Sequence, residues 1–338
     1  MRIDVRRGTV RKIIVIALCM LVLSLAACAP GDDGPGNSSG GADGLIVIGF
    51  AQVGSESDWR LANTKSMNDT FSEDNGYRLV FRDAQQRQEN QISAIREFIS
   101  QKVDYIVFAP VTEEGWDEVL GEAKAAGIPV IIVDRMISTS DHSLYTCWVG
   151  SDFRNEGDVA VAWMEEAFRD REGLRIVHLQ GSMGSSAQIG RTEGLDAGVA
   201  NNPGWEVISR ASGDFNQMGG KERMEYILTQ FSSFDVLYCE NDNMAFGAME
   251  AMDAAGMFYG VGREVVVISF DATNAGLIAT LEGSINYNVE CNPMHGPRVE
   301  AIIAQLERGE TPDKLAYVTE VAFDAMTITQ EIVDARDY

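Results

Sequence analysis

The sequence predicts an α/β protein built from two doubly wound lobes, each with a parallel sheet. Three observations support this fold class. The chain has 338 residues, which favours two domains over one. From residue 45 onward, short β-branched runs alternate with longer amphipathic stretches, and the runs form two series of four. Continuous apolar strands that alternate with helices are typical of parallel sheets covered on both faces. We expect the second half to begin near Gly150.

The first series of strand-like runs lies between residues 45 and 135, and it consists of LIVIGF, YRLVFRD, DYIVFAP and IPVIIVDR. The second series lies between residues 174 and 271, and it consists of LRIVHLQG, WEVISRA, DVLYCEND and EVVVISFD. Apolar residues recur at helical spacing between these runs. The clearest helical windows are ENQISAIREFISQ, TEEGWDEVLGEAKAAG, GDVAVAWMEEAFRD, MGGKERMEYILTQF and NMAFGAMEAMDAAG.

The first 27 residues are predicted to be a signal peptide. A basic leader precedes the apolar stretch IIVIALCMLVLSLAA, which has the length of a signal-peptide core. The stretch ends in LAAC, which resembles the bacterial lipobox and predicts that Cys28 becomes the lipidated first residue. The alternative is a plain secretory signal that is cut nearby. Residues 28–44 are rich in Gly, Ser, Pro and Asp and are expected to form a flexible tether, so we predict an extracytoplasmic protein anchored to the cell membrane.

The formal net charge is −24, which makes a nucleic-acid partner improbable because phosphate binding needs clustered Lys and Arg. The acidity is typical of a solvated, self-repelling surface. Outside the leader and tether, the cysteines are Cys147, Cys239 and Cys291, an odd number without metal-like spacing. Each lies in an apolar run, so we expect buried thiols, with no metal site and no cofactor.

Polar residues follow most of the predicted strands, at the edge where open parallel sheets bind ligands. These polar ends are residues 52–60, Arg82 and Asp83, Asp134 and Arg135, Gln180 and Gly181 with Arg191 on the next helix, residues 212–215, residues 240–242, and Asp271. Capping of the following helix accounts for Asp242 and in part for Asp83. If the two lobes face each other, the remaining groups converge on one cleft.

The chemistry of these groups fits an uncharged, polyhydroxylated ligand. Asp134 and Asp271 can accept hydrogen bonds from neighbouring hydroxyls, and Arg60, Arg135 and Arg191 can donate in a fixed fork. The aromatic rings of Trp59 and Phe215 can cover the apolar face of a sugar. Two alternatives stay open. Trp59 can be a core residue at a helix start, and Asp134 and Arg135 can neutralise each other across the domain boundary.

The chain resembles the substrate-binding proteins of bacterial sugar ABC importers, in the ribose and galactose family. The likeness covers nearly all of the body, and it is nearest to the galactofuranose-binding branch. That branch shares the opening GFxQVGSESxWR, which corresponds to residues 49–60, and then QENQI, APV, GW, VLxEAK, IPV, DR, SLY, QG, SGDF, NDxM and NP in the same order. The resemblance implies the type I periplasmic binding protein fold, with two lobes joined by three hinge crossings.

The resemblance also implies a set of ligand contacts. Six groups match positions that contact the ligand in the family. They are the opening loop, the Asp-Arg pair, the arginine and the aromatic of the second lobe, the amide of the ND motif, and the carboxylate after the next strand. Either Glu290 or Cys291 occupies the position of a common glutamine, and Ala272 and Asn243 depart from the family pattern. The candidate ligand-binding residues are Ser55, Glu56, Trp59, Arg60, Asp83, Asp134, Arg135, Arg191, Phe215, Asn241, Asp271 and Glu290.

By this resemblance the N-terminal lobe comprises residues 45–150 and 285–319, and the C-terminal lobe comprises residues 151–284 and 320–338. The crossings are expected near residues 150–152, 284–291 and 318–321. The implied function is capture of a monosaccharide by hinge closure and its delivery to an ABC permease, by a monomer. A sensor that presents the sugar to a receptor kinase or chemoreceptor stays open, as does the identity of the sugar.

No catalytic residue is predicted. The three histidines form no HExxH motif, and the sequence contains no clear nucleophile elbow. The carboxylates are better matched as hydroxyl acceptors than as a glycosidase pair. Sugar-responsive repressors share the fold but begin with a DNA-binding helix-turn-helix, where this chain has a signal segment.

Overall fold

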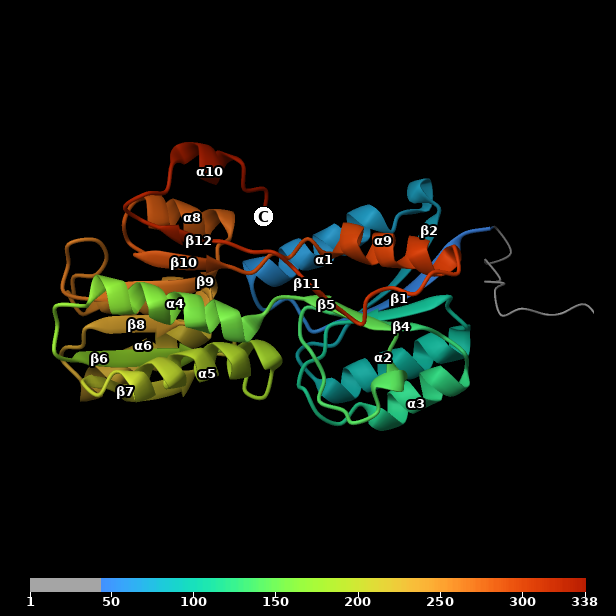
Figure 1. Ribbon diagram of the computed structural model, residues 1–338, viewed down its shortest axis with the longest axis horizontal. Helices are drawn as coiled ribbons and strands as arrows, with labels where there is room; N and C mark the ends of the chain where they lie inside the picture. Colours follow the sequence, from blue (N-terminus) through green and yellow to red (C-terminus); the bar gives the residue numbers. More distant parts are fainter. Residues whose placement is uncertain (1–43) are drawn as a thin grey trace, which may run out of the picture. The chain divides into compact units, whose positions relative to one another are not determined.

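The computed structural model of the protein describes residues 44–338, which contain two six-stranded sheets (Figure 1). The first sheet has the order β11-β5-β4-β3-β1-β2, and all its pairings are parallel. Its strands are β1 (Ile46–Gln52), β2 (Tyr77–Asp83), β3 (Tyr105–Phe108), β4 (Val130–Val133), β5 (Cys147–Gly150) and β11 (Leu315–Tyr317).

The second sheet has the order β12-β10-β9-β8-β6-β7 and is parallel except for the β10–β12 pair. Its strands are β6 (Leu174–Gln180), β7 (Trp205–Ser212), β8 (Val236–Cys239), β9 (Val266–Asp271), β10 (Tyr287–Glu290) and β12 (Ala322–Asp324). The predicted fold class is therefore confirmed.

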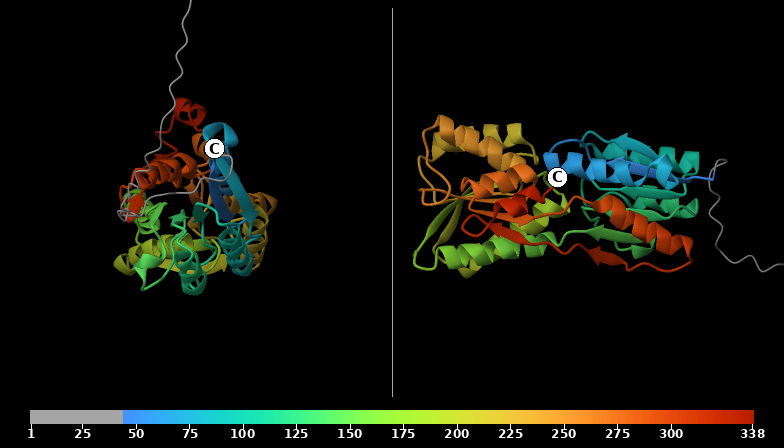
Figure 2. Two further views of the ribbon diagram at one scale, coloured as in Figure 1. Left: turned by 90° about the vertical axis from the view of Figure 1, so that its right-hand side faces the viewer. Right: turned by 90° about the horizontal axis from the view of Figure 1, so that it is seen from above.

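Helices cover both faces of each sheet, as Figures 1 and 2 show. The first sheet carries α1 (Asp58–Thr70), α2 (Gln88–Gln101), α3 (Asp117–Ala125) and α9 (His295–Glu307), with the short 3-10 helices η1 (Glu73–Asn75) and η2 (His142–Leu144). The second carries α4 (Phe153–Ala167), α5 (Ser186–Asn201), α6 (Gln217–Gln230), α7 (Asp242–Ala254), α8 (Asn274–Leu281) and α10 (Gln330–Asp334). Two apolar clusters lie on each sheet, one per face, and they form the core of each lobe.

The sequence expectation and the structure differ at the second crossing. Residues 287–290 form β10, which pairs with β9 and β12 of the second sheet. Residues 287–290, which the sequence placed with the N-terminal lobe, therefore lie in the second sheet. The reason is that each sheet contains two further short strands outside the series of four predicted runs, and their pairing depends on tertiary contacts.

Three chain crossings join the two sheets, and hydrogen bonds tie them to one another. They run from β5 to α4, from β10 to α9, and from β11 to β12. The hydroxyl of Ser151, in the first, donates to Oε1 of Glu320, in the third, at 2.7 Å and lies 3.3 Å from Sγ of Cys291, in the second. The backbone N–H of Asn292 donates to the same Glu320 oxygen at 2.6 Å.

The two lobes also contact each other away from the crossings. The side chain of Asn243 accepts from the backbone N–H of Asp58 at 3.0 Å and donates to the Asp58 carboxylate at 3.1 Å. The N–H of Glu113 donates to the carbonyl of Gly184 at 3.0 Å, and the N–H of Met136 donates to the hydroxyl of Ser186 at 2.8 Å. The lobes are therefore closed on one another.

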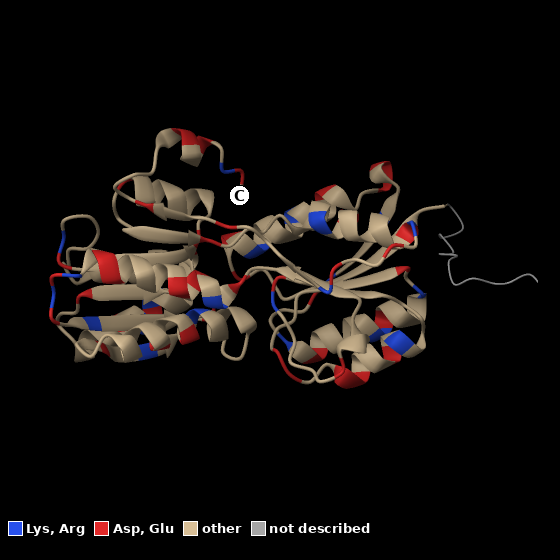
Figure 3. Ribbon diagram, in the orientation of Figure 1, with Lys and Arg blue, Asp and Glu red and all other residues tan. Residues whose placement is uncertain are grey.

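Cys147, Cys239 and Cys291 are buried free thiols, as expected from the sequence. Acidic residues are spread over the helices and loops of both lobes (Figure 3). Among residues 44–338, none of the helices combines the length and the apolar character that a membrane crossing requires.

The backbones of α4 and α5 pack against each other through glycines. A Cβ at Gly194 would lie 2.6 Å from the backbone of Gly157, and a Cβ at Gly157 would lie 2.9 Å from the carbonyl of Arg191. Neither contact can be relieved by rotating a side chain. The close packing fixes the helix turn that carries Arg191.

We expect Gly194→Ala to lower the free energy of unfolding by about 1–3 kcal/mol, because the added methyl group overpacks two backbones. Urea unfolding followed by circular dichroism measures this change. Gly121→Ala is the matched control, because a Cβ there meets nothing within 4 Å, and a helical Gly→Ala change gains up to about 1 kcal/mol. Equal effects of the two substitutions would contradict the packing argument.

Candidate functional site

One cavity of about 290 Å³ lies at the carboxyl ends of the strands of both sheets. This volume includes space open to solvent, so the enclosed part of the cavity suits only a small ligand. Strand ends, helix starts and the second crossing all contribute to its wall. The residues that line it are Glu56, Ser57, Trp59, Arg60, Asp134, Arg135, Phe153, Ala187, Arg191, Phe215, Asn241, Asp271 and Cys291.

Arg60 organises the wall contributed by the first lobe. It lies in the first turn of α1, where Ser57 caps the helix by accepting from the Arg60 N–H at 3.1 Å. The guanidinium donates to Glu56 at 2.9 Å and to Gln52 at 3.2 Å, and it lies 2.8 Å from Oδ2 of Asp134. Burial by itself would lower the Arg60 pKa, but Asp134 and Glu56 raise it above the usual range, so the group stays charged.

Arg135 is less fully engaged than Arg60. It donates one hydrogen bond, at 3.2 Å to the carbonyl of Val111, and its guanidinium lies 3.6 Å from Glu56 and 4.0 Å from Asp134. Burial, with the neighbouring Arg60 charge, lowers the pKa of Arg135 to about 10, and the group is still protonated at neutral pH. Its remaining N–H donors are available at the cavity wall.

Arg191, on α5, organises the wall contributed by the second lobe. Its Nε donates to Glu156 at 2.6 Å, Nη1 donates to the carbonyl of Glu240, and Nη2 lies 3.6 Å from Asp271. Burial raises the pKa of Asp271 well above its ordinary value, and Arg191 opposes this effect. Burial also raises the pKa of Glu156 to about 7, although the Arg191 guanidinium acts to lower it.

Three aromatic rings complete the cavity. Trp59 donates from its indole N–H to the carbonyl of Cys291 at 2.6 Å, which fixes the ring between α1 and the second crossing. Phe215 lies under the Arg135 guanidinium, with 5.2 Å from Cζ to the ring centre. A Cβ at Gly181 would lie 1.9 Å from the Phe215 ring, so only glycine leaves room for the ring. Phe153 begins α4 and packs with the same group.

Three cavity residues have a left-handed backbone conformation. The φ angles are 60° at Asp134, 59° at Phe215 and 99° at Asp271. Such conformations are unfavourable for non-glycine residues and cluster at functional sites. All three residues lie where a strand or turn meets the cavity, so the backbone is bent to direct these side chains.

The structure brings together most of the residues predicted from the sequence. Nine of the twelve candidates line the cavity, and they are Glu56, Trp59, Arg60, Asp134, Arg135, Arg191, Phe215, Asn241 and Asp271. Asn241 also caps α7, accepting from the N–H of Met244 at 2.9 Å and donating to the carbonyl of Phe215 at 3.0 Å.

Three candidates lie elsewhere. Ser55 is exposed, because the loop turns it away from the wall. Asp83 is exposed and accepts from the N–H of Gln85 at 2.7 Å, which stabilises the turn after β2. Glu290 ends β10 and binds the C-terminal segment, accepting from Arg336 at 2.6 Å and from Tyr338 at 2.9 Å. Of the two alternatives at the second crossing, Cys291 is the one that lines the cavity.

Sequence reasoning missed Ser57, Phe153 and Ala187. Ser57 was within the quoted loop, and its capping role could have been read from its place before the helix. Phe153 directly follows the first crossing, which is the signal that could have identified it. Asp242 does not cap its own helix. It accepts four hydrogen bonds, from Ser269, Asn288 and both polar groups of Thr273, and so holds the start of α8.

Buried polar atoms without hydrogen-bond partners are concentrated around the cavity. They include Oε2 of Glu56, Oδ2 of Asp134, Nη2 of Arg191 and, one layer behind, Oε1 of Glu156. The Asp134 oxygen is 2.8 Å from Arg60 but lacks the alignment of a hydrogen bond. Because most buried polar atoms in proteins are satisfied, acceptors and a donor left over on both lobes indicate a polar ligand.

A buried histidine supports the floor beneath Trp59. Nδ1 of His295 lies 2.8 Å from the amide nitrogen of Asn63, whose oxygen accepts from Gln52, and the Trp59 ring packs edge-on at 6.0 Å. Burial lowers the pKa of His295 to about 4 from 6.5. The folded protein therefore holds His295 neutral, and the unfolded chain binds its proton more tightly.

Stability should consequently fall as the pH drops from 6.5 towards 4, because protons favour the unfolded state there. For His295→Gln this contribution is absent, so the wild type should lose about 2 kcal/mol more than the variant between pH 7 and pH 5. Urea unfolding at both pH values measures the difference. The exposed His142→Gln variant serves as the control and should follow the wild type; parallel curves for wild type and His295→Gln would refute the assignment.

The fold and the cleft together define a two-lobed solute-binding protein, and comparison with known proteins establishes its family. A family model described as "Periplasmic binding protein domain" matches residues 48–295. The chain belongs to this family, and its fold is that of the type I periplasmic binding proteins, as the sequence resemblance predicted.

Among individual relatives, the chain is 35% identical to the galactofuranose-binding protein of Escherichia coli (strain K12), over 95% of this chain and 96% of the relative. A Mycobacterium smegmatis structure in complex with β-D-fucofuranose is 41% identical, with a TM-score of 0.80, and covers 86% of this chain and 93% of its own. The binding protein of the arabinose ABC transporter from Shewanella sp. ANA-3, bound to α- and β-L-arabinofuranose, is 37% identical. Its TM-score is 0.79, and the match covers 86% of this chain and 95% of that protein.

These relatives are binding proteins, which confirms the prediction that the chain is not an enzyme.

Proposed function

We propose that the protein captures a monosaccharide outside the cytoplasm, in its furanose form, by closure of the two lobes. The observation that carries the proposal is the set of unpartnered buried atoms at the cavity, with acceptors on Glu56 and Asp134 and a donor on Arg191. Neighbouring sugar hydroxyls both donate and accept, so one small ligand can satisfy acceptors on one lobe and a donor on the other.

The charges in the cavity favour an uncharged ligand. Three arginines line it, and the carboxylates of Glu56, Asp134 and Asp271 line it as well. Each arginine already has a carboxylate within 4.0 Å, so no excess positive charge is left for a phosphate or a sugar acid. Hydrogen bonds from charged groups to neutral hydroxyls are each worth about 1.5–3 kcal/mol, which suffices for tight binding of a small sugar.

The furanose preference is supported by the relatives. The two solved structures named above hold furanose sugars, and the Escherichia coli relative is named for galactofuranose. The small cavity and the rings of Trp59, Phe153 and Phe215 fit a compact five-membered ring with an apolar face.

Closure is the step that links binding to transport. Glu56, Asp134 and Arg135 lie on the first lobe, whereas Arg191 and Asp271 lie on the second, so only the closed form offers both sets of contacts. A ligand that bridges them stabilises that form by its differential affinity. We assign residues 45–150 and 294–317 to the N-terminal lobe and residues 153–290 and 322–338 to the C-terminal lobe, with the crossings between them.

Delivery to an ABC permease is the most economical role for the closed form, and a monomer suffices for it. The relatives include the binding component of an arabinose ABC transporter and the fructose import binding protein of Bifidobacterium longum (strain NCC 2705), which is 29% identical over 95% of this chain. Co-purification of the sugar-loaded protein with the permease encoded nearest to its gene is the direct test.

The ligand can be identified by calorimetry against free pentoses and hexoses, including L-arabinose, D-galactose and D-fucose. We expect micromolar or tighter binding to at least one sugar. With that sugar ¹³C-labelled at C1, the NMR shift of the bound anomeric carbon distinguishes furanose from pyranose. Binding of no neutral sugar would contradict the function, and a bound pyranose would contradict only the ring form.

Arg135→Ala should weaken sugar binding by at least about 100-fold, because it removes a buried guanidinium whose unused N–H donors are available to the sugar. The fold should persist, since Arg60 continues to pair with Glu56 and Asp134. Arg96→Ala is the matched control, because this exposed guanidinium pairs only with surface carboxylates. Normal affinity of the Arg135 variant in calorimetry would show that the residue does not contact the ligand.

We also propose that Cys28 carries the membrane anchor. Cys28 lies outside the described residues, and the proposal rests on the LAAC motif and the tether composition. Expression with a labelled fatty acid should label the wild type and leave Cys28→Ser unlabelled and released from the membrane fraction. Cys19→Ser, within the same leader, is the control and should be labelled. Labelling of Cys28→Ser would contradict the anchor site.

A further inference from the structure

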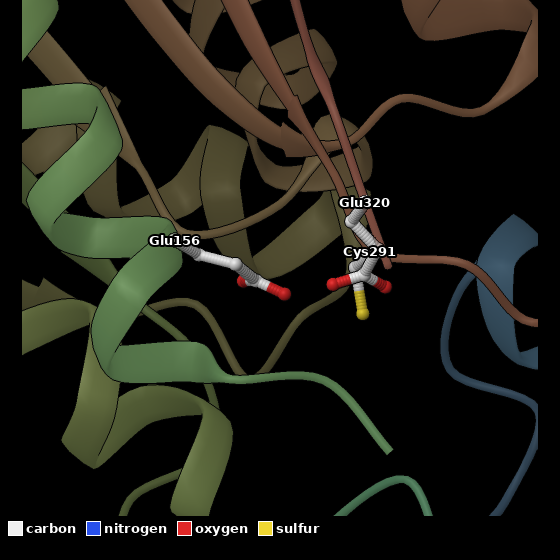
Figure 4. Close-up of side chains that lie close together, drawn as sticks. All are labelled: Glu156, Cys291 and Glu320. Atoms are coloured by element: carbon white, nitrogen blue, oxygen red, sulfur yellow. The ribbon is translucent and has the colours of Figure 1, made fainter. Parts of the chain in front are cut away.

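A second cluster of reactive side chains lies where the crossings meet. It consists of Glu156 on α4, Cys291 in the second crossing and Glu320 in the third (Figure 4). One carboxylate oxygen from each glutamate and the cysteine sulfur all lie within 4.8 Å of one another. We call these three residues the hinge cluster.

One member of the cluster has an unsatisfied atom directed into it. Glu156 is 2% exposed, and its Oε1 has no hydrogen-bond partner. Its other oxygen is held by Nε of Arg191 at 2.6 Å, which fixes the carboxylate. Figure 4 shows the free end of this carboxylate pointing towards Cys291 and Glu320. Arg191 is therefore the cation of this carboxylate, but the oxygen that faces the thiol and the second carboxylate accepts no hydrogen bond.

The second carboxylate, unlike Glu156, has no ion pair within the described part of the chain. Among residues 44–338, no Lys or Arg lies within ion-pair distance of Glu320, whose hydrogen bonds come from Ser151 and the N–H of Asn292. Two carboxylates held this close in a poorly solvated place repel each other unless a cation or a proton lies between them. We therefore expect the hinge cluster to hold either a cation or a proton.

We propose that the hinge cluster binds a zinc-class divalent ion. Thiolate sulfur with carboxylate oxygen is a ligand set for zinc and for its thiophilic analogue cadmium, whereas Mg²⁺ and Ca²⁺ take oxygen ligands alone. The 4.8 Å limit on the ligand atoms leaves a small inward rotation for coordination. On binding, the Cys291 thiol releases its proton to solvent as the metal–sulfur bond forms.

The surroundings supply access and a place for water as a fourth ligand. Glu156 and Glu320 line a second cavity of about 740 Å³, which Asp152 and Glu290 make acidic. Cys291 lines the sugar cavity instead. The cluster therefore lies between the two cavities, and an aqueous cation can reach it from the acidic side without entering the sugar site.

Metal binding at this place would tie α4 to two of the three crossings. The hinge could then bend only if a metal ligand were released. The ion would contact the connection between the lobes, although Cys291 also lines the sugar cavity and Glu156 holds Arg191 of its wall. Metal binding can be tested in the absence of any sugar.

The test is titration of the metal-free, reduced full-length chain with Cd²⁺, followed by the ultraviolet thiolate-to-cadmium absorption, and with Zn²⁺ by calorimetry. We expect one ion per chain in the wild type. Cys291→Ala should abolish the absorption increment, whereas Cys147→Ala and Cys239→Ala, which remove equally buried thiols, should leave it unchanged. Mg²⁺ should give no binding heat.

Glu320→Gln provides a variant that keeps the acceptor oxygen for Ser151 and Asn292 but removes the charge. It should weaken Zn²⁺ binding by at least about 10-fold, since even outer-shell changes at metal sites cost about 10–100-fold. Circular dichroism verifies folding of each variant. Equal Zn²⁺ affinity and stoichiometry in wild type, Cys291→Ala and Glu320→Gln would overturn the site, as would a wild type that binds no ion and holds protons there instead.

Discussion

The buried charge network around Arg60 is the constraint on which the site depends. Its guanidinium holds Glu56 and Asp134, which come from the loop after β1 and the end of β4. Removing these charges from water is costly unless they are paired. Pairing within the first lobe holds the two carboxylates in a fixed orientation before any ligand arrives, and it leaves Arg135 with unused donors. The second lobe repeats the arrangement, with Arg191 between Glu156 and Asp271.

The fold was largely predictable, because burial of a parallel sheet on both faces leaves a strong signal in runs such as IPVIIVDR. The strands β5, β10, β11 and β12 were not predicted, because they lie outside the two series of four runs and their pairing depends on tertiary contacts. The lobe boundary before β10 was misplaced for this reason. Nine candidate residues line the cavity, and most of them could be proposed because polar groups directly follow buried strands, a pattern that a helix cap alone does not explain.

The misses have equally local causes. Asp83 and Ser55 lie in turns whose direction depends on backbone conformation, and sequence does not reveal which way such a turn faces. Phe153 is an apolar residue at a crossing, where an apolar side chain is indistinguishable from a core residue until the lobes are placed together, and at the second crossing the sequence left Glu290 and Cys291 as alternatives. The hinge cluster escaped for the same reason, because Glu156, Cys291 and Glu320 are far apart in the chain and share no spacing motif.

The reciprocal bonds between Asp58 and Asn243 have a consequence for selectivity. This pair joins the lobes without being among the residues that line the sugar cavity, so its contribution is the same whichever sugar is enclosed. It raises the population of the closed state and thus every affinity by one common factor. Discrimination between sugars therefore depends on the residues of the cavity wall. The Asp58–Asn243 pair slows reopening to the same extent for every sugar.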